Sequence, residues 1–288
     1  MTGVQTCALP IFAACGNPEY SGTPAPPEEN ESIEQNQNTE LPDDNADETN
    51  ETEEENTQPD PAETEQNDAD VDSPADEQPV KVAYEMNGIY DIVPIDETAN
   101  ENVVLLTFDD GPKEQEMLSE MLDILDKHEA KAIFFVNGYR VEQNPDLLKL
   151  IAERGHSIGN HSWDHIILRD LPQEEMGQQV EDVQEIVEEL IGERPKFFRP
   201  PNGAGSDLLK EKVASEGMLY MTWSNGSEDW VYDDPDTVIQ RVMEQLRPGS
   251  NILMHELPWT VEALDTLLTK ISEEGYEFIH PESIQIPD

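Results

Sequence analysis

The sequence predicts an α/β fold built on a parallel sheet, close to a (β/α)8 barrel or one unit shorter. Short apolar runs typical of buried strands alternate with amphipathic segments typical of helices. Polar motifs follow several of the apolar runs, as at the carboxyl ends of barrel strands, where the active sites of such barrels form. The chain has 288 residues, which is enough for one large domain or two small ones.

The alternation begins with the run Val103–Phe108, which reads as a buried strand. The later expected strands are Ala132–Val136, His156–Gly159, Phe197–Phe198, Leu219–Trp223, Asn251–Met254 and Tyr276–Ile279. Apolar residues recur at helical spacing between them, and glycine closes several of these segments. The expected helices are Gln115–His128, Pro145–Arg154, Pro172–Ile191, Asp207–Glu216, Pro235–Leu246 and Val261–Glu274. Residues 82–95 read as a short strand or strap that leads into the barrel.

Charge is distributed very unevenly along the chain. The net charge is -49, and the segment Gly16–Val80 holds 22 acidic residues with no Lys or Arg. Such a segment cannot bury enough apolar surface to offset its ordering entropy, so we expect a disordered acidic linker. The acidity also argues against nucleic acid as a partner, because phosphate binding needs basic patches. A neutral or cationic glycan is compatible with it.

The amino-terminal residues resemble the lipobox of a bacterial lipoprotein. Small residues precede Cys15, which would be lipidated, although Phe12 stands where Leu is usual. Residues 2–11 resemble translated sequencing-adapter read-through, and we expect that they replaced the natural signal start. The alternative is an ordinary disordered tail in which Cys15 has no role. The expected division is therefore a signal-like segment (1–15), an acidic linker (16–80) and a catalytic domain (81–288, core 103–279).

Two adjacent carboxylates stand where the first buried strand ends. Asp109 and Asp110 follow the apolar run, and a Gly-Pro pair then turns the chain. Neighbouring side chains on a strand point to opposite faces, so the two acids need not share one role. The same residues also suit an ordinary turn, and the functional interpretation depends on the motifs further along the chain.

Two histidines spaced four residues apart follow the expected strand at 156–159. His161 and His165 can meet on one face, and with a carboxylate they would form a three-ligand site for Zn²⁺ or a similar ion. Such a pair is often incidental, but the acidic pair one βα turn away favours a metal site. We expect the other three histidines to be structural or surface residues: His128, His156 and His280.

Three further motifs follow later strands. Residues 199–203 (Arg-Pro-Pro-Asn-Gly) form a stiff turn that could present a backbone N–H to an oxyanion, or could be only a rigid loop. Arg199 could pair with a carboxylate. His255 ends the expected strand at 251–254, where a general acid would stand. A buried carboxylate such as Asp229 would keep this histidine protonated.

Together the motifs resemble those of the polysaccharide deacetylase family, carbohydrate esterase family four. The sequence has Thr-Phe-Asp-Asp-Gly-Pro at 107–112, His-Ser-x-x-His at 161–165, Arg-Pro-Pro-x-Gly at 199–203, Asp-Trp at 229–230 and Leu-x-His at 253–255. Five motifs in the family's order make the resemblance specific, and it covers roughly residues 103–279. It implies a distorted (β/α)7 barrel after the acidic linker, and a metal-dependent hydrolase of N-acetylated glycans.

The resemblance also implies which residues hold the metal and which one acts as the base. Asp110, His161 and His165 would bind a divalent ion, with Zn²⁺ favoured and Co²⁺ as the second choice. Asp109 would be the general base that takes a proton from the attacking water. Arg199 would orient that base.

The remaining roles implied by the resemblance concern the acid and the substrate. His255 would be the acid that protonates the leaving amine, and Asp229 would tune it. The backbone N–H of Asn202 would stabilise the oxyanion. Trp230 and Leu253 would line the acetyl pocket.

The sequence departs from the family pattern at three positions. Asn202 stands where Tyr is frequent, Gly226 where many members have Asp, and Glu256 where Asp or Ser is common. None of these changes removes a metal ligand, the base or the acid. We therefore expect an active enzyme.

The leading hypothesis is an extracellular deacetylase, anchored to the cell membrane through Cys15 and facing the cell wall. Its expected substrate is the N-acetylglucosamine of peptidoglycan, and its catalytic domain is expected to be monomeric. Chitin, N-acetylmuramic acid and O-acetyl-xylan are alternative substrates with the same tetrahedral chemistry. A non-catalytic glycan-binding lipoprotein on the same barrel is the alternative from another class.

Overall fold

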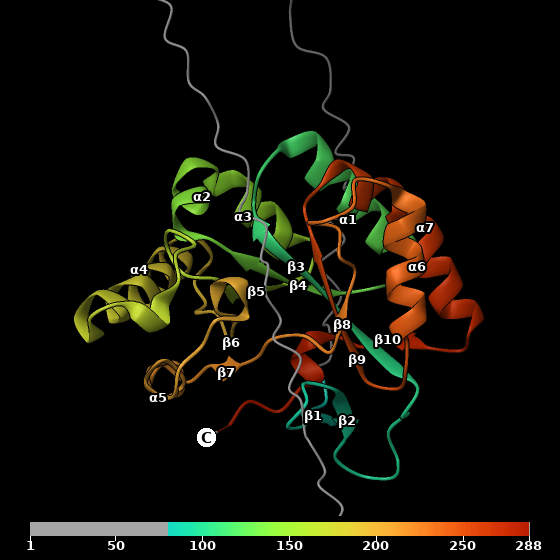
Figure 1. Cartoon of the computed structure of the whole chain (residues 1–288), viewed down its shortest axis with the longest axis horizontal. Helices are drawn as coiled ribbons and strands as arrows, with labels where there is room; N and C mark the ends of the chain where they lie inside the picture. The colour runs from blue at the N-terminus through green and yellow to red at the C-terminus, as the bar shows by residue number, and fades with distance from the viewer. Residues whose placement is uncertain (1–79, 288) are drawn as a thin grey trace, which may run out of the picture. The chain divides into compact units, whose positions relative to one another are not determined.

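The computed structural model describes residues 80–287, which form a curled parallel sheet with helices packed around it (Figure 1). The lipobox-like segment and almost all of the expected acidic linker lie outside the described residues. The domain boundary at residue 81 therefore stays a prediction.

The central sheet contains eight strands within residues 80–287, and every neighbouring pair in it is parallel. Its strands are β3 (Val103–Gly111), β4 (Ala132–Val136), β5 (Ser157–Asn160), β6 (Phe197–Phe198), β7 (Leu219–Tyr220), β8 (Asn225–Gly226), β9 (Ser250–His255) and β10 (Glu277–Phe278). The order is β7-β6-β5-β4-β3-β9-β8, and β10 pairs with the first residues of β3. The edge strands β7 and β8 are not paired with each other, so the barrel is distorted and open there. The prediction of a distorted (β/α)7 barrel is confirmed.

The helices cover the outside of the curled sheet. They are α1 (Gln115–Lys127), α2 (Gly138–Gln143), α3 (Pro145–Glu153), α4 (Gln173–Ile191), α5 (Asp207–Ser215), α6 (Pro235–Gln245) and α7 (Pro258–Glu273). In Figure 1, α1, α6 and α7 stand together, and α2, α3 and α4 form a second group. Each long helix buries one apolar stripe; in α1 the stripe is Leu118, Met121, Leu122 and Leu125.

Strand β3 separates two apolar clusters. Val104, Leu106 and Phe108 pack against the helices, whereas Val103 and Leu105 pack inside the curl of the sheet. This alternation is what a strand buried on both faces requires. By the same alternation Thr107 and Asp109 belong to the inner face, so β3 carries its last polar side chains towards the interior of the barrel.

Several elements differ from the sequence-based expectation. Residues 82–95 form an antiparallel pair, β1 (Tyr84–Met86) and β2 (Ile92–Pro94). The strand expected at 219–223 ends at Tyr220, because the carbonyl of Thr222 accepts hydrogen bonds from side chains instead of from a strand. The helix expected from Val261 begins at Pro258, which can occupy the first turn because it needs no amide donor. Neither the short helix α2 nor the two-residue strand β8 was expected.

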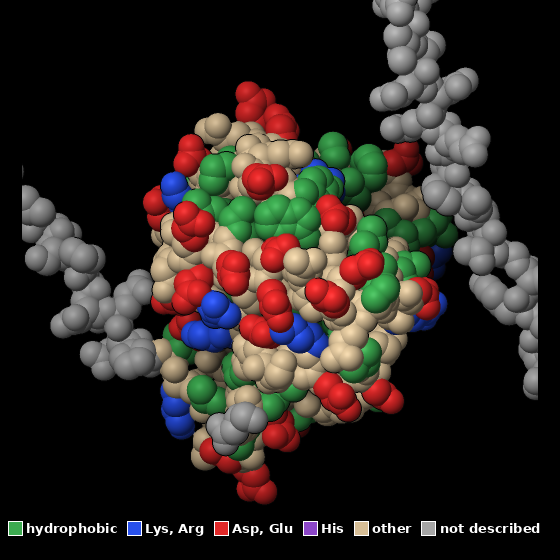
Figure 2. Space-filling view, turned by 90° about the vertical axis from the view of Figure 1, so that its left-hand side faces the viewer, with side chains coloured by type: hydrophobic (Ala, Val, Ile, Leu, Met, Phe, Trp, Pro, Cys, Tyr) green, Lys and Arg blue, Asp and Glu red, His purple; other side chains and the backbone are tan. Residues whose placement is uncertain are grey.

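Acidic side chains are spread over the surface that Figure 2 shows, and Lys and Arg form only small groups on that face. The surface therefore shows the same excess of acid as the sequence. Among residues 80–287, no helix is both long and apolar enough to cross a membrane.

Candidate active site

The residues singled out by the sequence gather at the carboxyl ends of the parallel strands. Asp109 and Asp110 end β3, and His255 ends β9, its neighbour in the sheet. The two histidines of the 161–165 motif follow β5, and the 199–203 segment follows β6. Residues far apart in the sequence become neighbours because parallel strands bring all their carboxyl ends to one edge.

Three side chains at this edge could hold a metal ion. The ligand atoms of Asp110, His161 and His165 all lie within 4.8 Å of one another. The Asp110 Oδ1 atom is 3.2 Å from His165 Nε2 and 3.5 Å from His161 Nε2. This oxygen is buried and has no hydrogen-bond partner within the described residues. An orphaned carboxylate oxygen facing two imidazoles fits a cation.

A backbone carbonyl settles the tautomer of one of these histidines. His161 Nδ1 lies 2.7 Å from the carbonyl oxygen of Arg199. A carbonyl can only accept, so Nδ1 carries the hydrogen and Nε2 keeps its lone pair, the form that a metal ligand needs. The 199–203 motif thus orients a candidate metal ligand through its backbone.

Backbone strain is concentrated at the same group. Asp110, Ser162 and His165 have φ angles of 65°, 66° and 57°. These left-handed conformations are unfavourable for residues other than glycine, and in folded proteins they cluster at functional sites. The register between β3 and β4 also shifts between Asp109 and Gly111. This bulge breaks the strict alternation, so both carboxylates reach the same side.

Electrostatics keeps two of the candidate ligands in their metal-binding forms. Burial alone would raise the pKa of Asp110, but nearby positive charge, chiefly His161 and His165, holds it below its ordinary value. Burial lowers the pKa of His165 from 6.5, although Asp110 opposes the shift. At neutral pH the first is therefore a carboxylate and the second a neutral imidazole.

The second carboxylate, Asp109, is held by a buried arginine. Arg199 Nη1 donates to Asp109 Oδ1 at 2.7 Å and to Thr107 Oγ1 at 2.8 Å. Asp109 Oδ2 points instead towards the metal-ligand group and lies 3.6 Å from His161 Nε2. One oxygen is thus fixed by the ion pair, and the other is left facing the group.

The guanidinium of Arg199 is fully buried, and its surroundings explain how it stays there. Its Nη2 donates to the Thr222 carbonyl at 2.8 Å and to Asn251 Oδ1 at 3.2 Å, and its Cζ lies over the Phe135 ring, 4.3 Å from the ring centre. Burial lowers the pKa of Arg199, and Asp109 opposes that shift. An arginine remains charged in proteins, so Asp109 has a permanent cationic partner.

Asp229 and His255 form a second pair of a carboxylate and a cation. Asp229 is fully buried, and its Oδ1 accepts from His255 Nδ1 at 2.7 Å. Its Oδ2 accepts from the His255 amide and from Thr260 Oγ1. Burial would lower the pKa of His255, but the hydrogen bond and charge of Asp229 raise it above 6.5. The imidazole is held as an acid, with Nε2 as the nitrogen free to give up a proton.

The predicted substrate residues lie around these pairs. Trp230 is 48% exposed, and its ring meets that of His255 edge-on at 5.5 Å. Leu253 is buried in β9. Asn202 is exposed in the short 3-10 turn η2 (Pro201–Gly203) with a φ angle of 56°.

Sequence reasoning missed several supporting residues. Thr107, Asn251 and Thr260 hold Arg199 or Asp229 in place through the hydrogen bonds given above. Asn251 had a detectable signal, because a polar residue at the head of an apolar strand needs a buried partner. In the sequence Glu256 is only a departure from the family pattern, yet it is 1% exposed beside His255.

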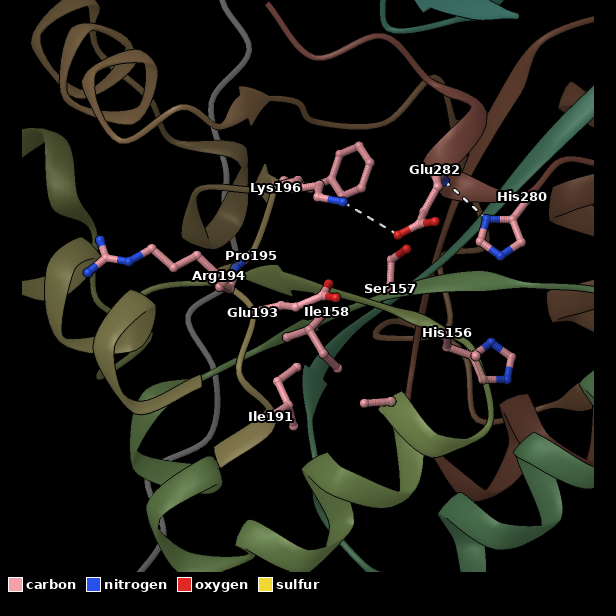
Figure 3. Close-up of a pocket in the computed structure, with 13 residues that line it drawn as sticks. His156, Ser157, Ile158, Ile191, Glu193, Arg194, Pro195, Lys196, His280 and Glu282 are labelled. Carbon is pink, nitrogen blue, oxygen red and sulfur yellow. Dashed lines mark hydrogen bonds and ion pairs between the residues drawn. The ribbon is translucent and has the colours of Figure 1, made fainter. Parts of the chain in front are cut away.

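A cavity of about 420 Å³ lies away from the carboxyl ends of the strands (Figure 3). It is lined by residues at the amino ends of β5 and β6, including His156 and Lys196, and by Glu282 in the 3-10 turn Pro281–Ser283. The ion pair between Lys196 and Glu282 spans 3.4 Å there. None of the predicted site residues lines this cavity, so it is distinct from the candidate active site.

Comparison with known proteins agrees with this geometry. The family model described as polysaccharide deacetylase matches residues 96–221. A peptidoglycan-N-acetylglucosamine deacetylase of Bacillus cereus is 34% identical over 204 residues, which are 69% of this chain and 70% of the relative. The peptidoglycan-N-acetylmuramic acid deacetylase PdaC of Bacillus subtilis is 36% identical over 190 residues. That match covers 65% of this chain but only 40% of PdaC, so the chain spans about two fifths of that relative's length.

A solved structure extends the likeness to three dimensions. The crystal structure of BA3943, a CE4 family pseudoenzyme from Bacillus anthracis, superposes with a TM-score of 0.60 at 34% identity. The match covers 62% of this chain and 63% of that one. Fold, motif geometry and sequence identity over most of a relative's length lead to one conclusion. The chain belongs to the polysaccharide deacetylase family.

Proposed function

We propose that this chain removes N-acetyl groups from a cell-wall glycan by metal-dependent hydrolysis, and that its substrate is the N-acetylglucosamine of peptidoglycan. The observation that carries the proposal is the meeting of three groups at one barrel edge: the metal-ligand triad, the Arg199-held Asp109 and the Asp229-held His255. A base, an acid and a cation site are what amide hydrolysis by an activated water requires.

A divalent metal is the proposed cofactor, held by Asp110, His161 and His165. Two imidazoles and one carboxylate suit Zn²⁺, with Co²⁺ as the alternative. When bound, such an ion lowers the pKa of a coordinated water to about 7 and polarises the acetyl carbonyl.

The side chains of the site divide the proton transfers between them. Asp109 uses the oxygen that Arg199 leaves free to accept a proton from the attacking water. His255, kept protonated by Asp229, donates from Nε2 to the departing amine. The Asn202 amide would face the developing oxyanion, and Trp230 and Leu253 would border the acetyl group.

The substrate rests on the names of relatives and on the accessible chemistry. Proteins similar to this chain are named for N-acetylglucosamine and for N-acetylmuramic acid in peptidoglycan. Chitin and O-acetyl-xylan offer acetyl groups to the same machinery. Release of acetate from defined oligomers of each glycan, with the protein loaded with Zn²⁺ or Co²⁺, should be fastest with peptidoglycan fragments. Faster release from chitin oligomers would replace the proposed substrate.

The role of the base has its own test. Asp109→Asn keeps an acceptor for Arg199 but cannot take up a proton, so we expect acetate release to fall by at least about 10²-fold. Binding of Zn²⁺, followed by calorimetry, should be retained because the three ligands are intact. The control is Asp146→Asn, which makes the same change on exposed α3. Undiminished release by Asp109→Asn would reject the assignment.

A non-catalytic glycan-binding protein is the second candidate, because one similar structure belongs to a pseudoenzyme. The complete set of base, acid and three ligands supports the enzyme instead. Glycan binding without Zn²⁺ uptake and without acetate release would favour the non-catalytic alternative.

We also propose an extracellular location, with Cys15 as the site of a lipid anchor. The support is the lipobox-like sequence before Cys15 and the acidic segment after it, which would serve as a spacer towards the wall. A Cys15→Ser variant, expressed behind a functional signal sequence, should be released from the membrane fraction.

A further inference from the structure

Two partly buried cations next to the active site, Lys113 and Arg140, have no carboxylate partner within the part of the chain that the structure describes. The chain has sixteen Lys and Arg residues, and all of them lie in the described part. Five of them have no carboxylate oxygen of residues 80–287 within 4.0 Å: Lys81, Lys113, Arg140, Lys210 and Lys270. Three of these are exposed, whereas Lys113 and Arg140 are partly buried. In so acidic a protein, an uncompensated pair of partly buried cations requires an explanation.

Lys113 lies close to both the proposed metal site and the proposed acid His255. It follows the metal ligand Asp110 by three residues, and its Nζ donates to the carbonyl of Glu256, the residue after His255, at 3.2 Å. Burial lowers the pKa of Lys113, while the charges of Asp110 and Glu256 act in the opposite direction. The ammonium therefore stands at the mouth of the site, with only a neutral carbonyl as its hydrogen-bond partner.

Arg140 reaches the same place from α2. This helix lies beside the turn that leads to Lys113, because Asn144 Nδ2 donates to the Pro112 carbonyl at 3.4 Å. The Arg140 guanidinium lies 5.0 Å from the centre of the Tyr139 ring, and its buried Nε has no hydrogen-bond partner among residues 80–287. The arginine is close enough for its charge to act on Lys113. Its planar fork of N–H donors is suited to a carboxylate.

Glu256 is an internal anion whose charge acts on Lys113, but its carboxylate is not hydrogen-bonded to the Lys113 ammonium or the Arg140 guanidinium. Its Oε2 accepts from the backbone amide of Lys113 at 3.0 Å, and its Oε1 has no hydrogen-bond partner in the described part of the chain. The carboxyl is 1% exposed and packs against Gly111, where a Cβ would come within 1.8 Å of Oε1. Burial raises the pKa of Glu256 to about 7, so near neutral pH it supplies only part of a negative charge.

We infer that Lys113 and Arg140 form a subsite for a carboxylate carried by a sugar of the glycan substrate. The inference rests on the proposed deacetylase function and narrows its substrate to acidic glycans. In peptide-free strands of peptidoglycan the lactyl group of muramic acid supplies such a carboxylate beside each N-acetylglucosamine. Where a stem peptide is attached, that lactyl carboxyl is an amide, and chitin offers no carboxylate at all. Hydrogen bonds from Arg140 to this substrate carboxylate would satisfy the free N–H donors of the guanidinium. The negative charge of the carboxylate would also offset the positive charge that the fold leaves unpaired.

The test compares two glycans that differ only in that charge. One is a peptide-free tetrasaccharide of alternating N-acetylglucosamine and N-acetylmuramic acid, and the other is the same compound with its carboxyls reduced to alcohols. For the Zn²⁺-loaded chain we expect kcat/KM for acetate release to favour the acidic glycan by about 10-fold or more. Arg140→Gln should remove most of this preference and leave the rate on the reduced glycan within about twofold. Lys113→Gln should remove part of it.

The control is Lys270→Gln, which deletes an exposed cation without a carboxylate partner on α7 and should keep the preference. Equal rates of the wild-type chain on the two glycans would overturn the inference. So would an Arg140→Gln variant that slows both glycans equally, since that result would make Arg140 an internal partner of Glu256. If no glycan releases acetate, the proposed function fails separately. Calorimetric binding of the same two glycans by wild type and Arg140→Gln then decides whether the subsite exists.

Discussion

His156 is buried and His255 is partly buried; the two stand at opposite ends of parallel strands and have pKa values shifted in opposite directions. His255 ends β9, and its pKa is raised above 6.5 by Asp229. His156 precedes β5, and burial lowers its pKa to about 3, with help from the charge of Lys131. Its Nδ1 accepts from the Ala132 amide at 3.2 Å, and its ring meets Phe134 edge-on at 5.3 Å.

The difference shows what the two ends of the barrel do. Burial alone favours the neutral imidazole. This is the state of His156, whose ring packs in the core and accepts one hydrogen bond from a backbone amide. A carboxylate at 2.7 Å reverses that outcome for His255. The carboxyl end therefore uses buried charge to maintain an acid that can act, and the amino end keeps its histidine neutral for structure.

The largest effect should come from removing His255, with the same substitution at His156 as the comparison. His255→Gln should lower kcat for acetate release by about 10²–10⁴-fold, the usual contribution of a general acid. His156→Gln should leave kcat within about threefold, because this residue lies at the other end of the strands. Steady-state kinetics with a peptidoglycan oligomer measures both. Equal losses in the two variants would remove the functional distinction between the ends.

A smaller effect is expected when the carboxylate that distinguishes the two histidines is neutralised. In Asp229→Asn, burial should dominate and move the pKa of His255 below 6.5. In the proposed mechanism His255 acts in its protonated form, so activity should fall as pH rises through this pKa. The alkaline limb of the pH–rate profile should move to lower pH, and activity at pH 8 should fall about 10-fold for every pH unit that the limb moves. Thr260→Val removes one donor to Asp229 but keeps its charge, and should move the limb less. An unchanged limb in Asp229→Asn would show that another group sets it.

The smallest effect concerns stability at the amino end. Because the folded pKa of His156 is about 3 and its unfolded value 6.5, its contribution to the free energy of unfolding is fully present above pH 6.5. This contribution is lost as pH falls from 6.5 towards 3, by up to about 1.4 kcal/mol per pH unit. His255 has the opposite sign: its contribution is present below pH 6.5 and is lost as pH rises through its raised pKa. Urea unfolding between pH 4.5 and 7 should give a shallower pH slope for His156→Gln than for wild type, and parallel slopes would contradict the prediction.

Local signals in the sequence were sufficient for most of the barrel. Strands such as β4 and helices such as α4 were predicted because they carry their own apolar pattern. Strand β8, with the sequence Asn225-Gly226, has no such pattern and exists because it pairs with β9. Helix α2 is six residues long, too short to give a periodic signal. Elements that depend on their neighbours for stability cannot be read from their own residues.

The candidate site also has a part that the sequence predicts and a part that depends on the fold. The sequence by itself determined which chemical groups would be available, because each motif stands at the end of an apolar run and parallel strands collect such ends at one edge. Only the tertiary structure decided how they are used. Asp109 and Asp110 reach one group because of a bulge and a left-handed residue. The turn beside α2 brings Lys113 close enough to Arg140 for the charge of Arg140 to act on it. His255 becomes an acid and His156 does not, because a pKa depends on which charge lies within a few ångströms, and the fold sets that distance.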